Sequence, residues 1–225
     1  MEKKINIAID GPAASGKSTT AKLLAKKLGF IYVDTGAMYR AATLAVLRNN
    51  IDPKDEPAVL NCLKDMDISL KLINGEQRTY LNGEDVSALL RSPEINRAIS
   101  AIASYPRVRA MMVHQQQRLA SDGGVIMDGR DIGTVVLPDA ELKIFMIADL
   151  KERAKRRLKE MEKANENIRL QEVITDIKRR DELDAARSTG PLKKADNARE
   201  LDTSALTIEQ QVEQIARWAE GLMEE

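Results

Sequence analysis

The stretch Gly11-Pro12-Ala13-Ala14-Ser15-Gly16-Lys17-Ser18 decides the fold. It fits the pattern of two glycines separated by four residues, followed by a lysine and a hydroxyl residue. The segment before it (4–10) is rich in isoleucine and predicts a strand, and the segment after it (17–28) has helix-forming composition. A strand, a glycine-rich turn and a helix N-terminus together form a cradle for phosphate groups. The alternative, a glycine-rich turn with a chance lysine, does not predict this order of flanking elements.

Each residue type in this loop has a chemical reason to be there. The glycines let the backbone turn tightly and direct N–H groups inward. Lys17 brings a mobile cation to the β- and γ-phosphates, and Ser18 offers a hydroxyl to Mg²⁺. The sequence therefore predicts that a nucleoside triphosphate binds here with Mg²⁺, through Gly11, Pro12, Ala13, Ala14, Ser15, Gly16, Lys17, Ser18 and Thr19.

The architecture follows from the spacing of the apolar segments. Short apolar runs occur at 4–10, 30–33, 125–127, 142–147 and around Leu201, and segments of helical composition separate them. This alternation predicts a three-layer α/β fold with a five-stranded parallel sheet, whose ligands lie at the carboxyl ends of the strands. The last helix begins with a capping box, Thr207 to Gln210, and has one apolar face.

One region interrupts the alternation. Residues 67–73 and 78–81 have strand propensity and flank Asn74-Gly75, which predicts an antiparallel hairpin. Residues 86–90 fit a further strand or a short helix. We therefore expect an inserted lobe, after which a helix over 108–119 resumes the alternation.

A second set of polar side chains follows two of the predicted strands. The strand at 125–127 ends at Asp128, which is typical of an acid that holds Mg²⁺ with Ser18. The next residues, Gly129-Arg130-Asp131, supply a guanidinium that can fork onto a phosphate and a carboxylate that can accept from a base amino group. Tyr39 and Arg40 follow the strand at 30–33. A kinase that used the glycine-rich loop for its phosphate donor would need such a second anion site for its acceptor.

The region 151–187 is mostly helical and highly charged. Arg153 and Arg157 are one helical turn apart, and we expect them to belong to a mobile lid that supplies cations to the transferring phosphoryl group. Arg180, Asp184 and Arg187 are spaced to lie on one helical stripe, which suits a sugar phosphate. The alternative for both groups is a solvated helix face with ion pairs.

Composition excludes several other classes of protein. Lysine plus arginine and aspartate plus glutamate each number 35, and only seven residues are aromatic, so we expect no binding to nucleic acid. One cysteine, Cys62, and one histidine, His114, make neither a disulfide nor a structural zinc site. No long apolar stretch or signal peptide is evident, so we expect a cytoplasmic protein, with no membrane partner. Without an apolar heptad seam we expect a monomer.

Five segments in order resemble the bacterial cytidylate kinase family. They are the glycine-rich loop with its preceding Asp10, Asp-Thr-Gly-Ala-Met-Tyr-Arg at 34–40, Pro-Arg-Val-Arg at 106–109, Asp-Gly-Arg-Asp-Ile-Gly-Thr-Val-Val at 128–136, and Lys-Arg-Arg-Asp-x-x-Asp-x-x-Arg at 178–187. The resemblance implies one kinase domain over 1–225 with an acceptor-binding lobe at 37–100 and a lid at 150–170. It also implies CMP and dCMP as acceptors, ATP as donor and Mg²⁺ as cofactor. Family members use serine as well as threonine at position 35, and glycine as well as serine at position 18.

The resemblance also assigns roles to residues. It implies that cytosine is read by Ser100, Arg109 and Asp131. The acceptor phosphate would be held by Arg40, Arg130 and Arg187, and the ribose by Arg180 and Asp184. The substrate set is completed by Thr35 and Tyr39.

The expected mechanism is direct in-line transfer, without a covalent intermediate or a general base, because the acceptor phosphate is already an oxyanion. The residues expected to act on the transferring group are Lys17, Arg130, Arg153 and Arg157. A kinase for UMP or for a small metabolite, and a nucleotide-dependent binding module without transfer, stay open as alternatives. Activity on different nucleoside monophosphates separates them.

Overall fold

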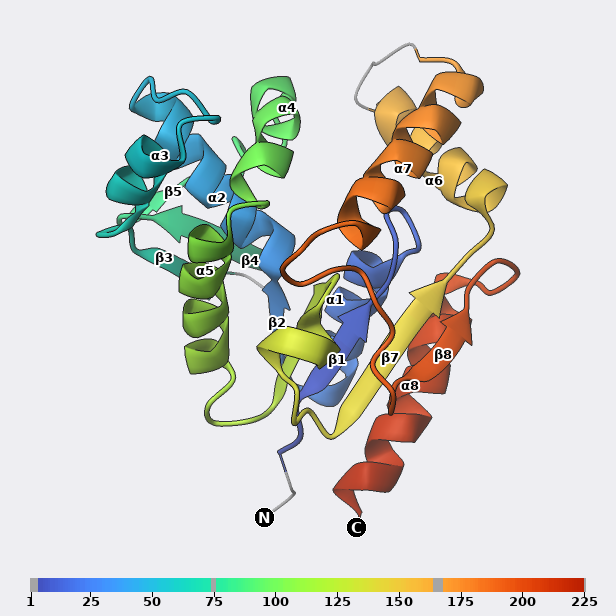
Figure 1. The fold of residues 1–225 in the computed structure, drawn as a ribbon. Helices are drawn as coiled ribbons and strands as arrows, with labels where there is room; N and C mark the ends of the chain where they lie inside the picture. The colour runs from blue at the N-terminus through green and yellow to red at the C-terminus, as the bar shows by residue number, and fades with distance from the viewer. Residues whose placement is uncertain (1–3, 74–75, 164–167, 225) are drawn as a thin grey trace. The chain divides into compact units, whose positions relative to one another are not determined.

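The strand that precedes the glycine-rich loop, β1 (Ile7–Asp10), lies at the centre of a five-stranded sheet (Figure 1). The computed structural model describes residues 4–73, 76–163 and 168–224. The strand order is β2-β6-β1-β7-β8, and β1 pairs in parallel with both β6 and β7. The bounds are Ile31–Asp34 for β2, Val125–Gly129 for β6, Leu142–Ile147 for β7 and Arg199–Asp202 for β8. The predicted five-stranded parallel sheet is confirmed.

Strands β1, β6, β7 and β8 and the start of β2 belong to the first of two compact units, which comprises residues 1–32 and 119–225. Helices α1 (Lys17–Leu28) and α8 (Ile208–Met223) pack side by side on the sheet through a shared apolar cluster that includes Leu24, Ile144 and Ile215 (Figure 1). The predicted capping box begins α8, where the Thr207 and Gln210 side chains bond each other's backbone N–H groups. This core fixes the strand ends that carry the polar side chains.

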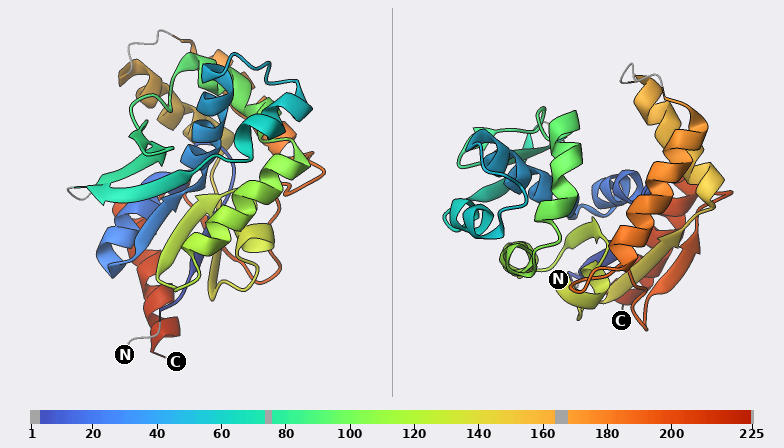
Figure 2. Two further views of the ribbon diagram at one scale, coloured as in Figure 1. Left: turned by 90° about the vertical axis from the view of Figure 1, so that its left-hand side faces the viewer. Right: turned by 45° about the horizontal axis from the view of Figure 1, so that its top comes forward.

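Two further helices of this unit, α6 (Leu150–Lys163) and α7 (Leu170–Ala185), run beside each other (Figure 2). They pack through a small apolar cluster of Ala154, Val173 and Ile177. The expected stripe of Arg180, Asp184 and Arg187 needs a correction, because α7 ends at Ala185 and Arg187 lies beyond it. Of the expected lid at 150–170, residues 164–167 lie outside the described part of the chain.

The second compact unit comprises residues 33–118, and the interval expected for the inserted lobe falls within it. Its three-stranded sheet, β3-β4-β5, is antiparallel and includes the predicted hairpin; the turn Asn74-Gly75 lies outside the described residues. The strand bounds are Ile68–Ile73, Glu76–Leu81 and Glu84–Asp85, and the helices are α2 (Thr35–Arg48), α3 (Glu56–Leu63), α4 (Pro93–Ile102) and α5 (Pro106–Leu119).

Two features of this unit differ from the sequence-based expectation. The expectation of a strand or helix at 86–90 was wrong, because this segment forms turns in which Leu89 N–H donates to Val86 O. Helices α3 and α4 were not predicted. Each is capped by an acid or hydroxyl, Asp55 or Ser92, and has a proline in its first turn, which is a recognisable start signal.

A short π-helix, η1 (Ile132–Val136), follows β6 directly and was also not predicted. Its wide turns are closed by hydrogen bonds from Val136 to Asp131 and from Leu137 to Ile132. Such turns are uncommon and recur at functional sites. Within the described residues, none of the helices combines the length and the apolar character that crossing a membrane requires.

Candidate active site

The glycine-rich loop between β1 and α1 adopts a backbone conformation that favours glycine at two positions. A side chain at Gly11 would meet the Met146 carbonyl oxygen at 2.2 Å, because the loop starts against the neighbouring strand β7. Gly16 has a φ of 98°, in the region where other residues are strained. The two glycines of the motif thus fix the path by which the chain leaves β1 and enters α1. We name residues 11–18 the phosphate loop.

Lys17 lies across the phosphate loop at the first position of α1. Its side chain is almost completely buried, and Nζ donates to the Pro12 carbonyl at 2.6 Å and to Ser15 Oγ at 3.2 Å. Burial, and next the charge of Arg130, lower the pKa of Lys17 to about 7, against the opposing effects of Asp128 and Asp10. The ammonium group is therefore held at the loop in a poorly solvated place, where a polyanion is its natural partner.

Ser18 and Asp128 come together as the sequence predicts. Ser18 Oγ donates to Asp128 Oδ2 at 2.7 Å, and Tyr32 OH donates to Asp128 Oδ1 at 2.8 Å. The carboxylate is 5 % exposed, whereas Ser18 is exposed. Tyr32, which was not predicted as a site residue, orients the acid from β2. A motif reading cannot find it, because its role depends on β2 and β6 being neighbours in the sheet.

Asp10, the last residue of β1, ties the phosphate loop to η1. Its two carboxylate oxygens accept from the N–H groups of Ile132 at 2.8 Å and Gly133 at 2.7 Å. These are the first backbone donors of the π-helix and have no partner inside it. Burial raises the pKa of Asp10 to about 6, although both backbone donors act in the opposite direction. Asp10 thereby fixes the position of Asp131, the buried residue that directly precedes η1.

An arginine–aspartate cluster lies where β6, α7 and the segment after α7 meet. Arg130 Nε donates to Asp184 Oδ2 at 2.7 Å, and Arg187 forms an ion pair with Asp184 Oδ1. Burial, and next the nearby Arg130, lower the pKa of Arg180. The structure thus brings together four of the predicted substrate residues in a cluster that is rich in guanidinium groups. Such a cluster suits the phosphate or sugar of a nucleotide.

Helix α6 contributes two arginines to the phosphate loop. Arg153 Nη1 donates to the Ala13 carbonyl at 3.2 Å and pairs with Asp181, whose other oxygen accepts from Ala13 N–H at 3.1 Å. Arg156 Nη1 donates to the Ser15 carbonyl at 3.2 Å. Asp181 and Arg156 were not among the predicted site residues. The signal for Asp181 was its place in the family-like segment 178–187, and the signal for Arg156 was its place in a charged segment.

The predicted lid pair therefore separates into two environments. Arg153 is buried against the phosphate loop, with a further bond from Nε to the Ala148 carbonyl at 3.0 Å. Arg157 is partly exposed and pairs with Glu160 of the same helix at 3.0 Å. One helical turn of spacing places both on α6, but only tertiary packing decides which guanidinium reaches the loop.

The remaining predicted substrate residues belong to the second unit. Thr35 is buried at the first position of α2, and the guanidinium of Arg109 lies 5.7 Å from the centre of the Tyr39 ring. Arg40 Nη1 donates to Asn96 Oδ1 at 2.8 Å on α4, where Ser100 is exposed. Within this unit the structure thus joins Tyr39 to Arg109, two residues that are far apart in the sequence.

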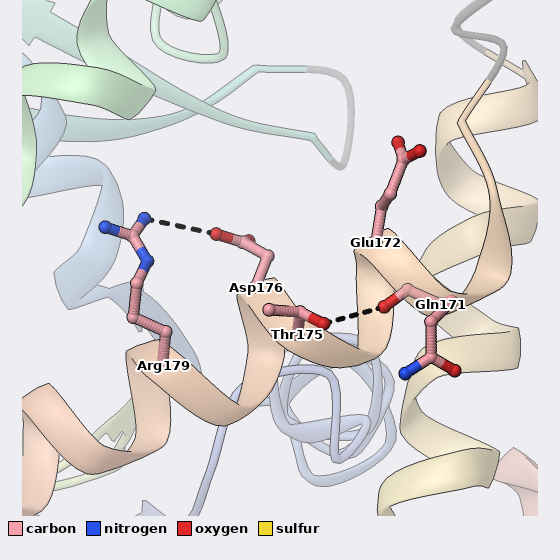
Figure 3. Close-up of a pocket in the computed structure, with 5 residues that line it drawn as sticks. All are labelled: Gln171, Glu172, Thr175, Asp176 and Arg179. Carbon is pink, nitrogen blue, oxygen red and sulfur yellow. Dashed lines mark hydrogen bonds and ion pairs between the residues drawn. The ribbon is translucent and has the colours of Figure 1, made fainter.

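A surface hollow on α7 does not coincide with any of these groups. It is lined by Gln171, Glu172, Thr175, Asp176 and Arg179, all from one helix (Figure 3). Arg179 pairs with Asp176 at 3.2 Å, and Thr175 donates to the Gln171 carbonyl. These two contacts join neighbouring turns of the same helix. We place the candidate active site at the phosphate loop, where buried titratable groups converge.

Comparison with known proteins gives one consistent family. The sequence profile of the cytidylate kinase family matches residues 7–220. Over 216 residues the chain is 50% identical to a cytidylate kinase of Bacillus licheniformis, covering 96% of each chain. It is 49% identical over 222 residues to a cytidylate kinase of Bacillus cereus, covering 99% of each.

Among solved structures, an unliganded sugar kinase from a Janibacter species resembles the chain with a TM-score of 0.50 at 11% identity. The likeness covers 97% of this chain and 95% of that one. At such low identity it shows the shared fold alone.

Proposed function

The chain belongs to the cytidylate kinase family, and on this premise we propose that it transfers the γ-phosphoryl group of ATP to CMP or dCMP. The products are ADP and CDP or dCDP. The observation that carries the proposal is the phosphate loop with the buried Lys17 laid across it, next to the guanidinium cluster around Arg130. The phosphate loop is the evidence for the nucleotide donor, and membership of the family is the evidence for the acceptor.

The donor triphosphate binds to the backbone N–H groups of the phosphate loop and to Lys17. A nucleotide replaces the loop contacts of the ammonium, at Pro12 O and Ser15 Oγ, with its own oxygens. Because the site is buried, this exchange gives charged acceptors to a cation whose two hydrogen-bond acceptors in the loop are neutral. Lys17 then neutralises charge as it shifts during transfer.

The residues beside the loop fit a magnesium ion. Mg²⁺ prefers oxygen ligands and keeps several waters, so kinase sites need few protein side chains. Ser18 Oγ and Asp128 Oδ2, 2.7 Å apart, supply a hydroxyl and a carboxylate of this kind, and Tyr32 holds the carboxylate. We assign Ser18 and Asp128 as the residues that hold it, directly or through water. When bound, the ion neutralises the β- and γ-phosphates.

We assign the acceptor phosphate to Arg130 and Arg187, with Arg40 from the second unit, and the ribose to Arg180 and Asp184. Asp184 now accepts from Arg130 and pairs with Arg187, so both guanidinium groups are pre-oriented by one carboxylate. Fixed guanidinium groups bind phosphate with less loss of side-chain entropy than free ones.

Cytosine selection is assigned to Asp131, with Ser100 and Arg109 from the second unit. Cytosine carries an N4 amino donor where uracil carries the O4 acceptor. A buried carboxylate that accepts from N4 would face an acceptor in uracil and lose its hydrogen bond. Asp131 is 5 % exposed, which makes that loss costly.

Transfer needs no general base, because the attacking phosphate oxygen of the acceptor is already ionised. The rate then depends on alignment, charge neutralisation and exclusion of water. We propose that residues 37–100 form the acceptor lobe and 150–170 the lid, with Arg153 and Arg157 acting on the transferring group. We further propose that the enzyme works in the cytoplasm as a monomer.

The test is a coupled assay of ADP formation with ATP–Mg²⁺ and, separately, CMP, dCMP, UMP and AMP. We expect turnover of CMP and dCMP, and a kcat/KM for UMP lower by at least about 100-fold. Equal activity on UMP would refute the base-reading role of Asp131. Binding of ATP without formation of CDP would instead favour a nucleotide-dependent binding module.

A further inference from the structure

A second hollow of the first unit lies away from the phosphate loop. It has a volume of about 270 Å³ and is bounded by η1, the start of β7 and the segment between α7 and β8, which runs beside them (Figure 1). Its lining includes Thr134, Lys143, Lys193, Lys194 and Asn197. None of these residues belongs to the site proposed for ATP or for the acceptor.

Lys143 gives the hollow a buried positive charge. The residue is 8 % exposed on β7, and Nζ donates to the Pro138 carbonyl. No carboxylate in the described part of the chain lies within ion-pair distance of it. A buried ammonium whose partner is a neutral carbonyl has lost hydration without gaining a counter-ion, and such a site favours an anion.

The other polar groups of the hollow point to the same ligand chemistry. Thr134 Oγ is buried and has no hydrogen-bond partner in the structure, so a donor is left for an acceptor oxygen. Lys193, at the exposed rim, makes no ion pair with the described residues. Lys194 does pair, with Glu200 at 3.0 Å, and Asp196 is the one carboxylate of the lining. In the lining of the hollow, the ammonium groups and the unused hydroxyl donor therefore outnumber the carboxylates.

We propose that this hollow binds a phosphate group, either free or carried by a small metabolite. Lys143 and Thr134 would contact the oxyanion at the base, and Lys193 at the rim. The site differs from the phosphate loop in kind, because it offers side-chain cations and a hydroxyl rather than a row of backbone N–H groups. It is also separate from the reaction proposed above, so either proposal can fail alone.

The experiment is a titration followed by NMR of the ¹⁵N-labelled full chain. The phosphate loop and acceptor site are first saturated with Mg²⁺, a non-hydrolysable ATP analogue and CMP, so that they cannot take up the added anion. Inorganic phosphate is added in one arm and glycerol 3-phosphate in the other, at constant ionic strength. The amide signals of Thr134, Ala195 and Asn197 report the hollow.

We expect these signals to shift saturably in at least one arm. Saturation by inorganic phosphate identifies a free phosphate as a ligand of the hollow, and saturation by glycerol 3-phosphate identifies an esterified one. Lys143→Met keeps the apolar stem and removes the charge, and should weaken binding by about tenfold or more. Lys193→Ala should weaken it less, and Lys54→Ala, an exposed lysine of the second unit, should not change it.

Two results would overturn the proposal. One is a response that rises linearly without saturation in both arms. The other is equal affinity in the wild type and in Lys143→Met. If Lys143→Met does not fold, Thr134→Val with Lys193→Ala decides in its place, since both changes remove side-chain contacts without leaving a buried charge.

Discussion

The hydroxyl of Ser18, in the first turn of α1, donates a 2.7 Å hydrogen bond to the carboxylate of Asp128 at the end of β6. The two residues are 110 positions apart in the sequence and meet because β1 and β6 are neighbours in the sheet. The pairing joins the phosphate loop to the strand that Arg130 directly follows. It is the contact on which the proposed magnesium site depends.

Ser18→Ala should raise the Mg²⁺ concentration for half-maximal velocity by about tenfold, because it removes one of two oxygen donors. The measurement is the rate of CDP formation at fixed ATP over a series of Mg²⁺ concentrations. Ser104→Ala, which removes an exposed hydroxyl from the second unit, is the matched control. An unchanged requirement in Ser18→Ala would remove this residue from the metal site.

Lys17→Ala should lower kcat by about 10³-fold while the fold remains intact, because a preorganised cation at the transferring phosphate is lost. Circular dichroism and the melting temperature check the fold. The control is Lys22→Ala, an exposed lysine on the same helix. A Lys17→Ala enzyme that kept most of its rate would contradict the role assigned to this residue.

The pH dependence of catalysis should reflect the lowered pKa of Lys17, about 7 in the enzyme without nucleotide. Above this pH the loop loses its cation, so kcat/KM for ATP should fall by about tenfold per pH unit. Bound phosphates raise the pKa, so kcat should hold to higher pH. In Lys17→Arg the alkaline limb of kcat/KM should disappear, since arginine stays protonated.

The same group predicts the pH dependence of stability. Between pH 7 and about 10.5 the unfolded chain holds a proton on Lys17 that the folded chain has released. The unfolded state therefore binds more protons, and the free energy of unfolding should rise with pH across this window. Lys17→Met should lose that rise. Melting temperatures measured from pH 7 to 9.5 compare the two proteins.

Arg153→Ala and Arg157→Ala should separate structural from catalytic effects. Arg153 is buried against the phosphate loop, so its loss should cost about 2 kcal/mol, or roughly 4–8 °C in Tm. Arg157 pairs with Glu160 at the surface, and its loss should change stability by less than about 0.5 kcal/mol. If Arg157 serves in the lid, its variant should still lose about tenfold in kcat. Unchanged kinetics in Arg157→Ala would reject the lid role.

Much of the fold and of the candidate site could be predicted from the sequence, because the signals that decide them are local. The phosphate loop is contiguous, and its glycines, Lys17 and Ser18 have roles set by their spacing alone. The five parallel strands were predicted because buried strands are continuous apolar runs, and their order placed Asp128 and Arg130 at strand ends. The end of α7 before Arg187 and the turns at 86–90 were mispredicted, because helix ends are weakly signalled and a segment of five residues is too short to show a periodicity.

Contacts between distant segments were decided only by the tertiary structure. Asp10 bonds the first amides of η1, and Asp181 joins Arg153 to the phosphate loop. Neither contact could be chosen beforehand, because the chain has many acidic residues and the sequence does not show which of them will meet η1 or the phosphate loop. Side-chain hydrogen bonds require a position within about 3 Å, and only the packing of helices on the sheet fixes positions that closely. The sequence thus determined which reactive side chains the chain carries, and the fold determined which of them lie together in one site.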